Sequence, residues 1–306
     1  MREPDGGKGD VWDDYRFVLA VHRAGTVSAA SRRLGVDHAT VIRRIDRLER
    51  RLGEKLFHRR ASGYTATQAG LALVAMADAV ESAIIHGEAT IGRAASQLVG
   101  TVRIGAPDGF GSTFLAPRLA GLVERHPELD IELVATARLF SLSKREADIA
   151  IGLSLPPEGR IVGRKLTDYA LRLYAAPAYL ARNPPIRTRS DLGGHRFVGY
   201  IDELLYSPEL DYLRQVAPGV SARLRSANLN AQLQATVAGL GLAVLPCFMA
   251  AGRGDLTCVL ADEITLTRSF WLMMHTDSRD LARIRAVAEH IYAVVEAERG
   301  VFGPVG

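Results

Sequence analysis

Cysteine is scarce in this 306-residue chain. Its two cysteines, Cys247 and Cys258, are not spaced as metal ligands, so we expect neither a disulfide framework nor a metal site. The first ten residues are polar and lack the apolar stretch of a secretion signal, which predicts a disordered tail. The longest apolar run, residues 237–251, is interrupted by two glycines and a proline and is too short to span a bilayer. These absences predict a cytoplasmic protein that needs no membrane.

Signatures of catalysis and of cofactor binding are also missing. Gly109 and Gly111 follow a predicted strand, but Phe114 stands where a dinucleotide-binding fingerprint needs its third glycine. The pair Gly239 and Gly241 fails in the same way. There is no nucleophile elbow, no phosphate-binding Walker loop and no metal-spaced histidine pair. We therefore predict that the protein is not an enzyme and holds no cofactor.

The positive charge of the chain is concentrated in one short stretch. Residues 32–60 hold ten arginines and lysines against four acidic residues, which gives +6. The whole chain carries a formal net charge of +4, so the remaining residues sum to −2. A local cationic segment is typical of a module that binds a polyanion such as double-stranded DNA. The alternative is that these arginines only solvate a helix.

The same stretch has the periodicity of two helices joined by a tight turn, behind a first helix at residues 12–24. The second helix is predicted to open at Ser28 and to stop at Gly35, which tolerates the left-handed backbone of many helix ends. Asp37 can cap the third helix. The apolar face of that third helix is formed by Val41, Ile45, Leu48 and Leu52. Its opposite face is small or cationic, which suits a DNA major groove.

A hairpin and a long helix are predicted next. Residues 56–58 and 64–65 read as a hairpin with Arg59 and Arg60 near its tip, a wing for phosphate or the minor groove. From Thr67 onward the apolar residues alternate spacings of four and three, which is a heptad seam. A rod of roughly 45 Å cannot bury this seam on the small domain before it, so we predict a dimerisation helix. The alternative is a core helix of the same chain. The predicted dimer contacts are Leu73, Ala77, Val80, Ile84 and Ile91.

From residue 100 the chain alternates short apolar strands with helices, which predicts a mostly parallel sheet. Strands are expected at residues 101–105, 129–135, 148–153, 161–166, 170–175, 197–201, 222–226, 242–245 and 270–275, with helices at 112–126, 228–238 and 281–297. The chain is predicted to leave one lobe near residue 168 and to re-enter it near residue 268. A cleft between two such lobes is a usual place for a small ligand.

The chain resembles the LysR-type transcriptional regulators over nearly its whole length. The N-terminal motifs that carry the resemblance include Phe17-Val18-Leu19-Ala20-Val21, Ala24-Gly25-Thr26-Val27-Ser28-Ala29-Ala30, Arg33-Leu34-Gly35-Val36, Arg43-Arg44-Ile45 and Thr67-Gln68-Ala69-Gly70. The C-terminal motifs are His126-Pro127-Glu128-Leu129-Asp130-Ile131, Glu146-Ala147-Asp148-Ile149-Ala150 and Gly239-Leu240-Gly241-Leu242-Ala243-Val244-Leu245-Pro246.

The resemblance implies an α/β chain with a winged helix-turn-helix head, a long linker helix and a two-lobed periplasmic-binding-protein-like effector domain. The expected boundaries are a tail at 1–10, the head at 11–66, the linker helix at 67–98 and the effector domain at 100–300. Lobe I is expected at 100–168 and 268–300, and lobe II at 169–267. Homodimers or homotetramers are implied, with RNA polymerase as a further candidate partner.

The predicted DNA contacts are residues of the head, chosen by their position in the helices and the wing and by the chemistry of their side chains. The usual Ser-Gln pair of the family is Asp37-His38 here, and Ile42 replaces the usual serine before the double arginine, so the base preferences of other members do not transfer. Arg43 is our first candidate for a base contact and Arg44 for a phosphate contact. The full predicted set is Ser28, Arg32, His38, Ala39, Thr40, Ile42, Arg43, Arg44, Arg47, Arg59 and Arg60.

The resemblance also places a small-molecule effector between the lobes. Predicted helix starts lie at Ser112, Thr113 and Asn228, and helix N-termini favour carboxylates, so a carboxylate effector is one candidate. Phe110 and Tyr200 are candidate walls of this site. The alternative is that the polar residues only cap their helices.

Two other functions remain open. One is a solute-binding or enzymatic α/β protein with an incidental basic head, and the other is an architectural DNA-binding protein that senses no ligand. The residues leave open the effector, the operator, the sign of regulation and the choice between dimer and tetramer.

Overall fold

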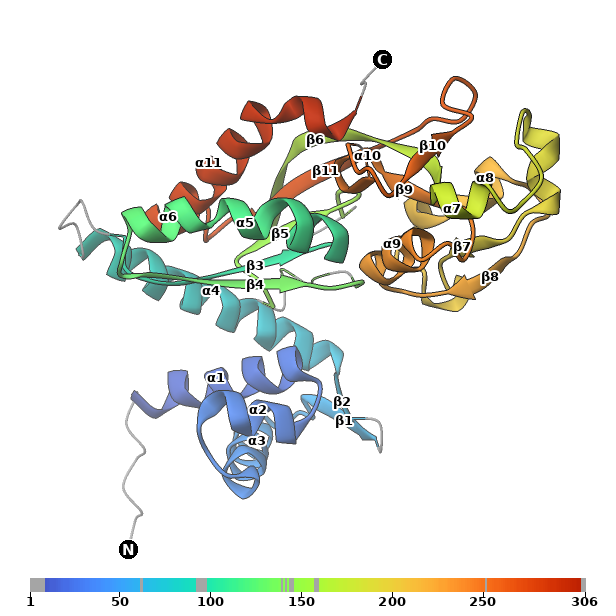
Figure 1. Ribbon diagram of the computed structural model, residues 1–306. Coiled ribbons are helices and arrows are strands. Elements are labelled where there is room, and N and C mark those ends of the chain that lie inside the picture. Colours follow the sequence, from blue (N-terminus) through green and yellow to red (C-terminus); the bar gives the residue numbers. More distant parts are fainter. Residues whose placement is uncertain are drawn as a thin grey trace, which may run out of the picture. The chain divides into compact units, whose positions relative to one another are not determined.

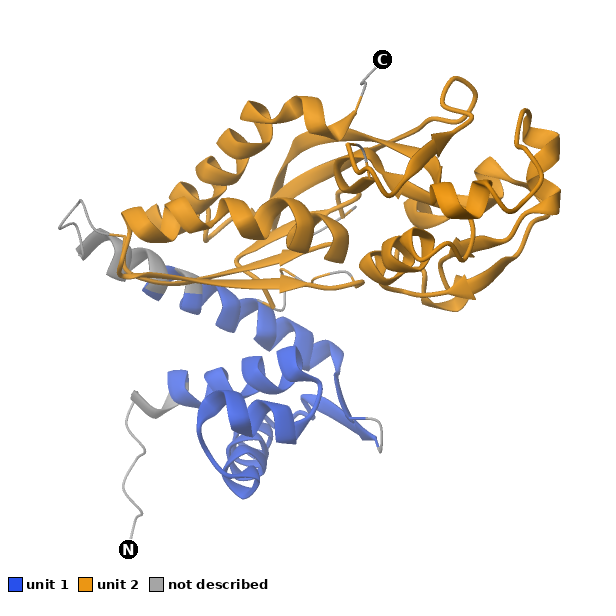
Figure 2. Cartoon of the chain, in the orientation of Figure 1, with its two compact units in different colours: residues 1–95 blue, residues 96–306 orange. Residues whose placement is uncertain are grey.

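The computed structural model describes residues 9–60, 63–91, 98–138, 140, 142, 146–156, 160–250 and 252–303 (Figure 1). The chain divides into two compact units, residues 1–95 and 96–306 (Figure 2). Of the predicted tail, residues 1–8 lie outside the described residues, and residues 9 and 10 already belong to the first helix. Within the described part, no helix is long and apolar enough to cross a membrane.

The N-terminal unit has the predicted order of elements. They are α1 (Gly9–Ala24), α2 (Val27–Leu34), α3 (His38–Leu52), β1 (Phe57–Arg60), β2 (Gly63–Ala66) and α4 (Gln68–Ile91). β1 and β2 pair antiparallel as a hairpin, which confirms the predicted hairpin. The core beneath them is built from apolar residues of α1, α2, α3, β1 and α4.

The turn between α2 and α3 depends on the residues at the helix ends. Gly35 follows α2 with a φ of 68°, a left-handed conformation that glycine adopts without strain. The Asp37 carboxylate accepts a hydrogen bond from the Thr40 backbone N–H at 2.7 Å, so the predicted cap of α3 is confirmed. The predicted start of α2 at Ser28 is wrong by two residues, because Thr26 is its N-cap and accepts from the Ala29 N–H.

The linker helix α4 is 24 residues long, and its first turns pack on its own unit. Leu73 and Ala77 are buried in the core of this unit, whereas Val80 and Ile84 are exposed. Arg23 of α1 also pairs with Glu81 of α4 at 2.7 Å. The expectation that the head could not bury the seam is therefore wrong for Leu73 and Ala77. The side chain of Ile91 and the end of the predicted rod lie outside the described residues.

The C-terminal unit is built on a mixed sheet, not on the mostly parallel one that we predicted. Its strand order is β10-β6-β11-β5-β3-β4, with β9 also paired to β6. Only the pairs β3–β4 and β3–β5 are parallel in this sheet. The strands are β3 (Gly100–Ala106), β4 (Leu129–Ala135), β5 (Ile149–Gly152), β6 (Ile161–Ala175), β9 (Ala243–Pro246), β10 (Thr257–Val259) and β11 (Leu266–His275). The sheet is mixed because β6 and β11 run antiparallel to their neighbours.

Two long strands connect the halves of this unit. β6 and β11 pair antiparallel along most of their length and extend between the half that holds β3, β4 and β5 and the half that holds β7 (Phe197–Gly199) and β8 (Ala222–Arg225) (Figure 1). Ser269 lies opposite Asp168 in this pairing, near the predicted crossing points. The two strands expected at 161–166 and 170–175 are thus one continuous strand.

The remaining helices cover the sheet and complete the second half. They are α5 (Ala116–Arg118), α6 (Ala120–Arg125), α7 (Pro177–Leu180), α8 (Leu213–Val216), α9 (Leu229–Val237), α10 (Cys247–Ala250) and α11 (Ala282–Ala297). A π-helix, η1, spans Phe110–Leu115, and short 3₁₀ turns span Arg189–Gly194, Asp202–Leu204, Pro208–Leu210 and Arg299–Phe302. Helical backbone begins at Asp108, so the predicted helix start at Ser112 is wrong by about one turn.

Candidate functional site

The exposed face of α3 carries several of the residues that we predicted to contact DNA. His38, Ala39, Ile42 and Arg43 are exposed, and the buried face of the helix is formed by Val41, Ile45 and Leu48. Arg43 forms no ion pair with any residue that the structure describes. Thr40 is half-buried, and its hydroxyl donates to Asp37 at 3.0 Å, which engages it in the helix cap.

Arg44 and Arg47 have internal partners that the sequence did not reveal. Asp14 of α1 is 1% exposed and accepts from Arg44 at 3.0 Å and from Arg47 at 2.6 Å. The half-buried Asp13 adds a second contact to Arg44 at 3.2 Å. These two arginines fasten α3 to α1, and the phosphate role of Arg44 stays a prediction. Their charge is partly neutralised within the unit.

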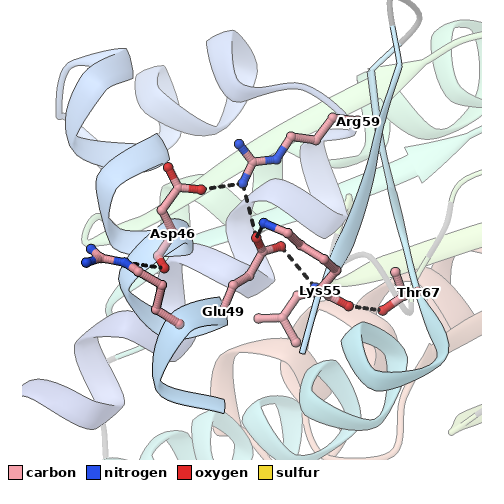
Figure 3. Close-up of polar contacts among 7 residues, drawn as sticks. Asp46, Glu49, Lys55, Arg59 and Thr67 are labelled. Atoms are coloured by element: carbon pink, nitrogen blue, oxygen red, sulfur yellow. Dashed lines mark hydrogen bonds and ion pairs between the residues drawn. The ribbon is translucent and has the colours of Figure 1, made fainter. Parts of the chain in front are cut away.

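The wing is fastened to the other side of α3, as Figure 3 shows. Arg59 of β1 pairs with Asp46 and lies 3.3 Å from Glu49, both on α3. Glu49 is 4% exposed and also accepts from Lys55 at 2.6 Å and from the Leu56 N–H at 3.0 Å. Burial by itself raises the pKa of Glu49, but these donors outweigh burial and hold that pKa below its usual value. Arg59 thus neutralises Asp46 on α3, the helix whose exposed face holds several of the predicted DNA contacts.

The other predicted DNA contacts lie at the edges of this surface. Ser28, Arg32 and Arg60 are exposed. Ser28 uses its carbonyl to accept a hydrogen bond from the Ser31 hydroxyl. The structure brings α2, α3 and the hairpin into one unit, which therefore carries the exposed arginines Arg32, Arg43 and Arg60 together.

A cavity of about 20 Å³ lies within the C-terminal unit, between its two halves. It is lined by Pro107, Asp108, Gly109, Phe110, Leu153, Tyr169, Tyr200, Tyr206, Leu210, Tyr212, Leu229, Pro246, Phe248 and Phe270. Seven of these residues are aromatic, and the strands β6 and β11 contribute Tyr169 and Phe270. The Tyr169 and Phe270 rings stack with their centroids 4.2 Å apart.

Asp108 is the charged group of this cavity. It is 4% exposed, and its carboxylate accepts the backbone N–H of Leu229, the first residue of α9, at 2.6 Å. Burial raises the pKa of the Asp108 carboxyl, against the opposing effect of N–H donors from Leu229, Gly109 and Asn230. The anion-binding start of α9 is therefore occupied by a carboxylate of the chain itself.

Four tyrosines surround the same carboxylate. Burial raises the pKa of each of their hydroxyls, and the negative charge of Asp108 contributes for Tyr200, Tyr206 and Tyr212. Tyr169 and Tyr212 are hydrogen-bonded to each other. All four hydroxyls stay protonated near neutral pH, so they act as hydrogen-bond groups and not as charges.

The predicted effector contacts divide into two groups. Phe110 and Tyr200 line the cavity as expected. Ser112 and Thr113 lie inside the helix, and their hydroxyls donate to the carbonyls of Asp108 and Gly109. Ser112 also accepts from Asn230 of α9 at 2.8 Å.

The third polar candidate, Asn228, caps α9 by accepting from the Ala231 N–H at 2.9 Å, which is the alternative that we had left open. Sequence reasoning missed Asp108, Tyr169, Tyr206 and Tyr212. The one available signal was an acidic residue directly after the first strand of the α/β part.

A second cavity of about 90 Å³ adjoins the first and lies between β7, β8 and the segment of residues 202–214. It shares Tyr200, Leu210 and Tyr212 with the smaller cavity. Its charged side chains include Asp202 and Arg214, whose closest approach is 3.6 Å. Both of these side chains are exposed.

Comparison with known proteins assigns both units. Residues 12–71 match the family described as bacterial regulatory helix-turn-helix protein, lysR family, and residues 95–296 match the LysR substrate binding domain. The Mau operon transcriptional activator of Paracoccus denitrificans is 30% identical over 277 residues, which cover 88% of this chain and 91% of that protein.

Solved structures share the fold along the chain. The Vibrio cholerae virulence activator AphB superposes with a TM-score of 0.58 at 23% identity, covering 92% of this chain and 98% of its own. ArgP from Mycobacterium tuberculosis superposes with a TM-score of 0.66 at 20% identity, covering 95% and 97%.

Proposed function

Because this chain belongs to the LysR family of DNA-binding transcriptional regulators, we propose that it reads DNA with the exposed face of α3 and that Arg43 makes the principal base contact. The family has a substrate-binding domain for an effector, and residues 95–296 supply it here. A regulator that binds the chromosome acts in the cytoplasm, and RNA polymerase is its natural partner once it is bound at a promoter.

The single observation that carries this proposal is the contrast among neighbouring arginines of α3. Arg44 and Arg47 are held by Asp14, whereas Arg43 is exposed and has no ion-pair partner among the described residues. A guanidinium that is not neutralised can bind the two acceptors of a guanine edge. Ile42, 37% exposed beside it, suits a thymine methyl.

The test is DNA binding by the Arg43→Ala variant, measured by fluorescence anisotropy on the region upstream of its own gene. We expect a loss of about 1–3 kcal/mol in binding free energy and a relaxed preference for that region over unrelated DNA. Arg51→Ala is the matched control, because it removes the same charge from the far end of α3 and should keep the preference. An Arg43→Ala variant whose affinity is unchanged across a salt titration would contradict the assignment.

We further propose that the chain forms a homo-oligomer through α4. Val80 and Ile84 remain exposed on this helix at 38% and 39%, one turn apart, and support a partner-facing stripe. Changing Ile84 to Glu should lower the mass measured by light scattering, whereas the same change at the exposed Leu71, which lies off the predicted seam, should not. An unchanged mass for Ile84→Glu rejects this interface.

The effector is proposed to bind at the cavity around Asp108. A wall shared by both halves of the unit supports this, because a ligand there changes how the halves are held together. Two rival functions, an α/β enzyme and an architectural protein that binds no ligand, would lack either specific DNA binding or a ligand response. The anisotropy experiment tests the first rival, and ligand-induced stabilisation tests the second.

A further inference from the structure

We propose that the Asp108 cavity selects a small ligand with a primary ammonium group, which the Asp108 carboxylate pairs and the surrounding aromatic rings enclose. This inference rests on the proposed role of the cavity as the effector site. It replaces the carboxylate that the helix N-termini suggested.

The first argument is that Asp108 differs from the other buried carboxylates. Among the described residues, the buried acids are Asp14, Glu49, Asp108 and Asp277. Asp14 pairs with two arginines, Glu49 pairs with Lys55, and Asp277 pairs with Arg160 at 2.6 Å. Asp108 has backbone N–H donors but no cationic side chain within the described part of the chain. A buried carboxylate without a counter-cation is suited to receive one from a ligand.

The second argument is the composition of the wall. Half of the fourteen lining residues are aromatic, and the lining includes neither Lys nor Arg. Aromatic faces attract a cation through the ring quadrupole, and enclosed ammonium groups are bound in such aromatic surroundings. Tyrosine oxygens can accept hydrogen bonds from the N–H groups of an ammonium. The wall and the carboxylate therefore favour the same sign of charge.

The third argument excludes a carboxylate ligand. An anion needs N–H donors or a cation, and the first N–H groups of α9 are already used by Asp108 and by the Asn228 cap. A second carboxylate in a cavity of about 20 Å³ would lie against the negative charge of Asp108. Repulsion between like charges is strong where water is excluded.

The size of the cavity limits the ligand. A volume of about 20 Å³ holds roughly one water-sized group, so an ammonium fits with at most a short alkyl chain. Tyr206 is half-buried and forms part of the wall, so it sets how much chain can follow the ammonium.

The experiment compares three probes on the full-length protein without DNA. Thermal unfolding is measured in ethylammonium chloride, in sodium acetate and in sodium chloride at equal ionic strength. We expect ethylammonium to raise the Tm above the sodium chloride value in a saturable way, and acetate to leave it unchanged. A shift with acetate, or none with ethylammonium, overturns the proposal.

Variants locate the response. Asp108→Asn keeps the shape of the side chain and an oxygen acceptor for the Leu229 N–H, and should bind ethylammonium about thirtyfold more weakly or worse. Asp202→Asn, which removes the same charge from the adjacent larger cavity, should keep the wild-type response. A wild-type response in Asp108→Asn, or its loss in Asp202→Asn, contradicts the assignment.

A second variant keeps Asp108, so the proposal can still be tested if the Asp108→Asn chain does not fold. Tyr206→Ala enlarges the cavity and should move the best probe from ethylammonium to butylammonium. If this variant prefers butyrate, or keeps the wild-type preference for ethylammonium, the inference is wrong. The DNA-binding test of Arg43→Ala does not depend on the ligand. It therefore shows whether the proposed DNA-binding function fails even if the ammonium proposal holds, or the reverse.

Discussion

Among the described residues, the N-terminal unit pairs each of its buried carboxylates with a cationic side chain, whereas the C-terminal unit pairs Asp277 with Arg160 but leaves Asp108 without one. In the N-terminal unit, Asp14 and Glu49 lie against arginine and lysine side chains from neighbouring elements. In the C-terminal unit, Asp108 lies against backbone N–H groups and tyrosines. An acid paired within the chain fixes one element on another, and an acid left without a cation can serve a ligand. Asp14, Glu49 and Asp277 are thus structural, and Asp108 is the buried acid that we propose for recognition.

This comparison also changes how the basic stretch is read. Residues 32–60 carry +6, but Arg44, Arg47, Lys55 and Arg59 are paired with acids of the same unit. Arg43 is exposed and has no ion-pair partner among the described residues, which is why we propose it for the DNA contact. The three predictions below test whether the paired arginines are structural, in order of expected effect.

Asp14→Ala should have the largest effect. It leaves Arg44 and Arg47 without their shared buried acceptor, and we expect the N-terminal unit to lose about 2–3 kcal/mol, less than for a fully buried pair because both arginines can turn to water. The readout is urea unfolding followed by Trp12 fluorescence in a Trp271→Phe background, since the chain has two tryptophans. The control Asp13→Ala should cost about 0.3 kcal/mol. Equal effects for the two variants would contradict a special role for Asp14.

Glu49→Gln should have an intermediate effect that depends on pH. The amide can still accept from the Leu56 N–H but loses the charge that pairs with Lys55, so we expect a loss of about 1 kcal/mol near neutral pH. Because the folded pKa of Glu49 is lowered, its stabilisation is present above the unfolded pKa and is lost as the pH falls through the folded pKa.

The pH dependence is checked in the same Trp271→Phe background. The difference in urea midpoint between Glu49→Gln and the parent should shrink from about pH 7 to about pH 3, on either side of the unfolded value. A difference that is constant with pH would mean that the charge of Glu49 contributes nothing.

Arg59→Ala should have the smallest effect on stability. Its partner Asp46 is partly exposed, so we expect a coupling of about 0.5 kcal/mol in a double-mutant cycle with Asp46→Asn. DNA affinity should fall in Arg59→Ala, because Asp46 then faces the phosphates without a neutralising partner, and Asp46→Asn should restore part of it. No recovery in the double variant would assign the loss to a direct phosphate contact of Arg59.

Local signals predicted the N-terminal unit well. Gly35 ends α2, Asp37 caps α3, and the spacing of Val41, Ile45 and Leu48 buries one face, because each depends on neighbours a few residues away. The same signals failed for Arg44 and Arg47, whose acceptor lies some thirty residues earlier in the chain. Sequence spacing predicts which face a residue occupies, but not which side chain from another helix meets it.

Two of the predicted effector contacts line a cavity of the C-terminal unit, and three have structural partners instead. Phe110 and Tyr200 were expected near the cleft and do line the cavity. The predicted polar contacts Ser112, Thr113 and Asn228 instead satisfy backbone groups of their own helices. The helical backbone starts at Asp108 and continues as a π-helix at Phe110–Leu115. No residue pattern in the sequence indicated this π-helix.

By itself the sequence determined the family, the division into a basic head and an α/β part, and the phase of the recognition helix, because these depend on short-range periodicity and on motifs. Only the tertiary structure decided which charged side chains form ion pairs or hydrogen bonds within the protein. Asp14 meets Arg44 and Arg47, and Asp108 meets the start of α9 more than a hundred residues later in the chain. An ion pair, or a carboxylate without a counter-cation, is a property of distance in space, and the order of residues does not contain that distance.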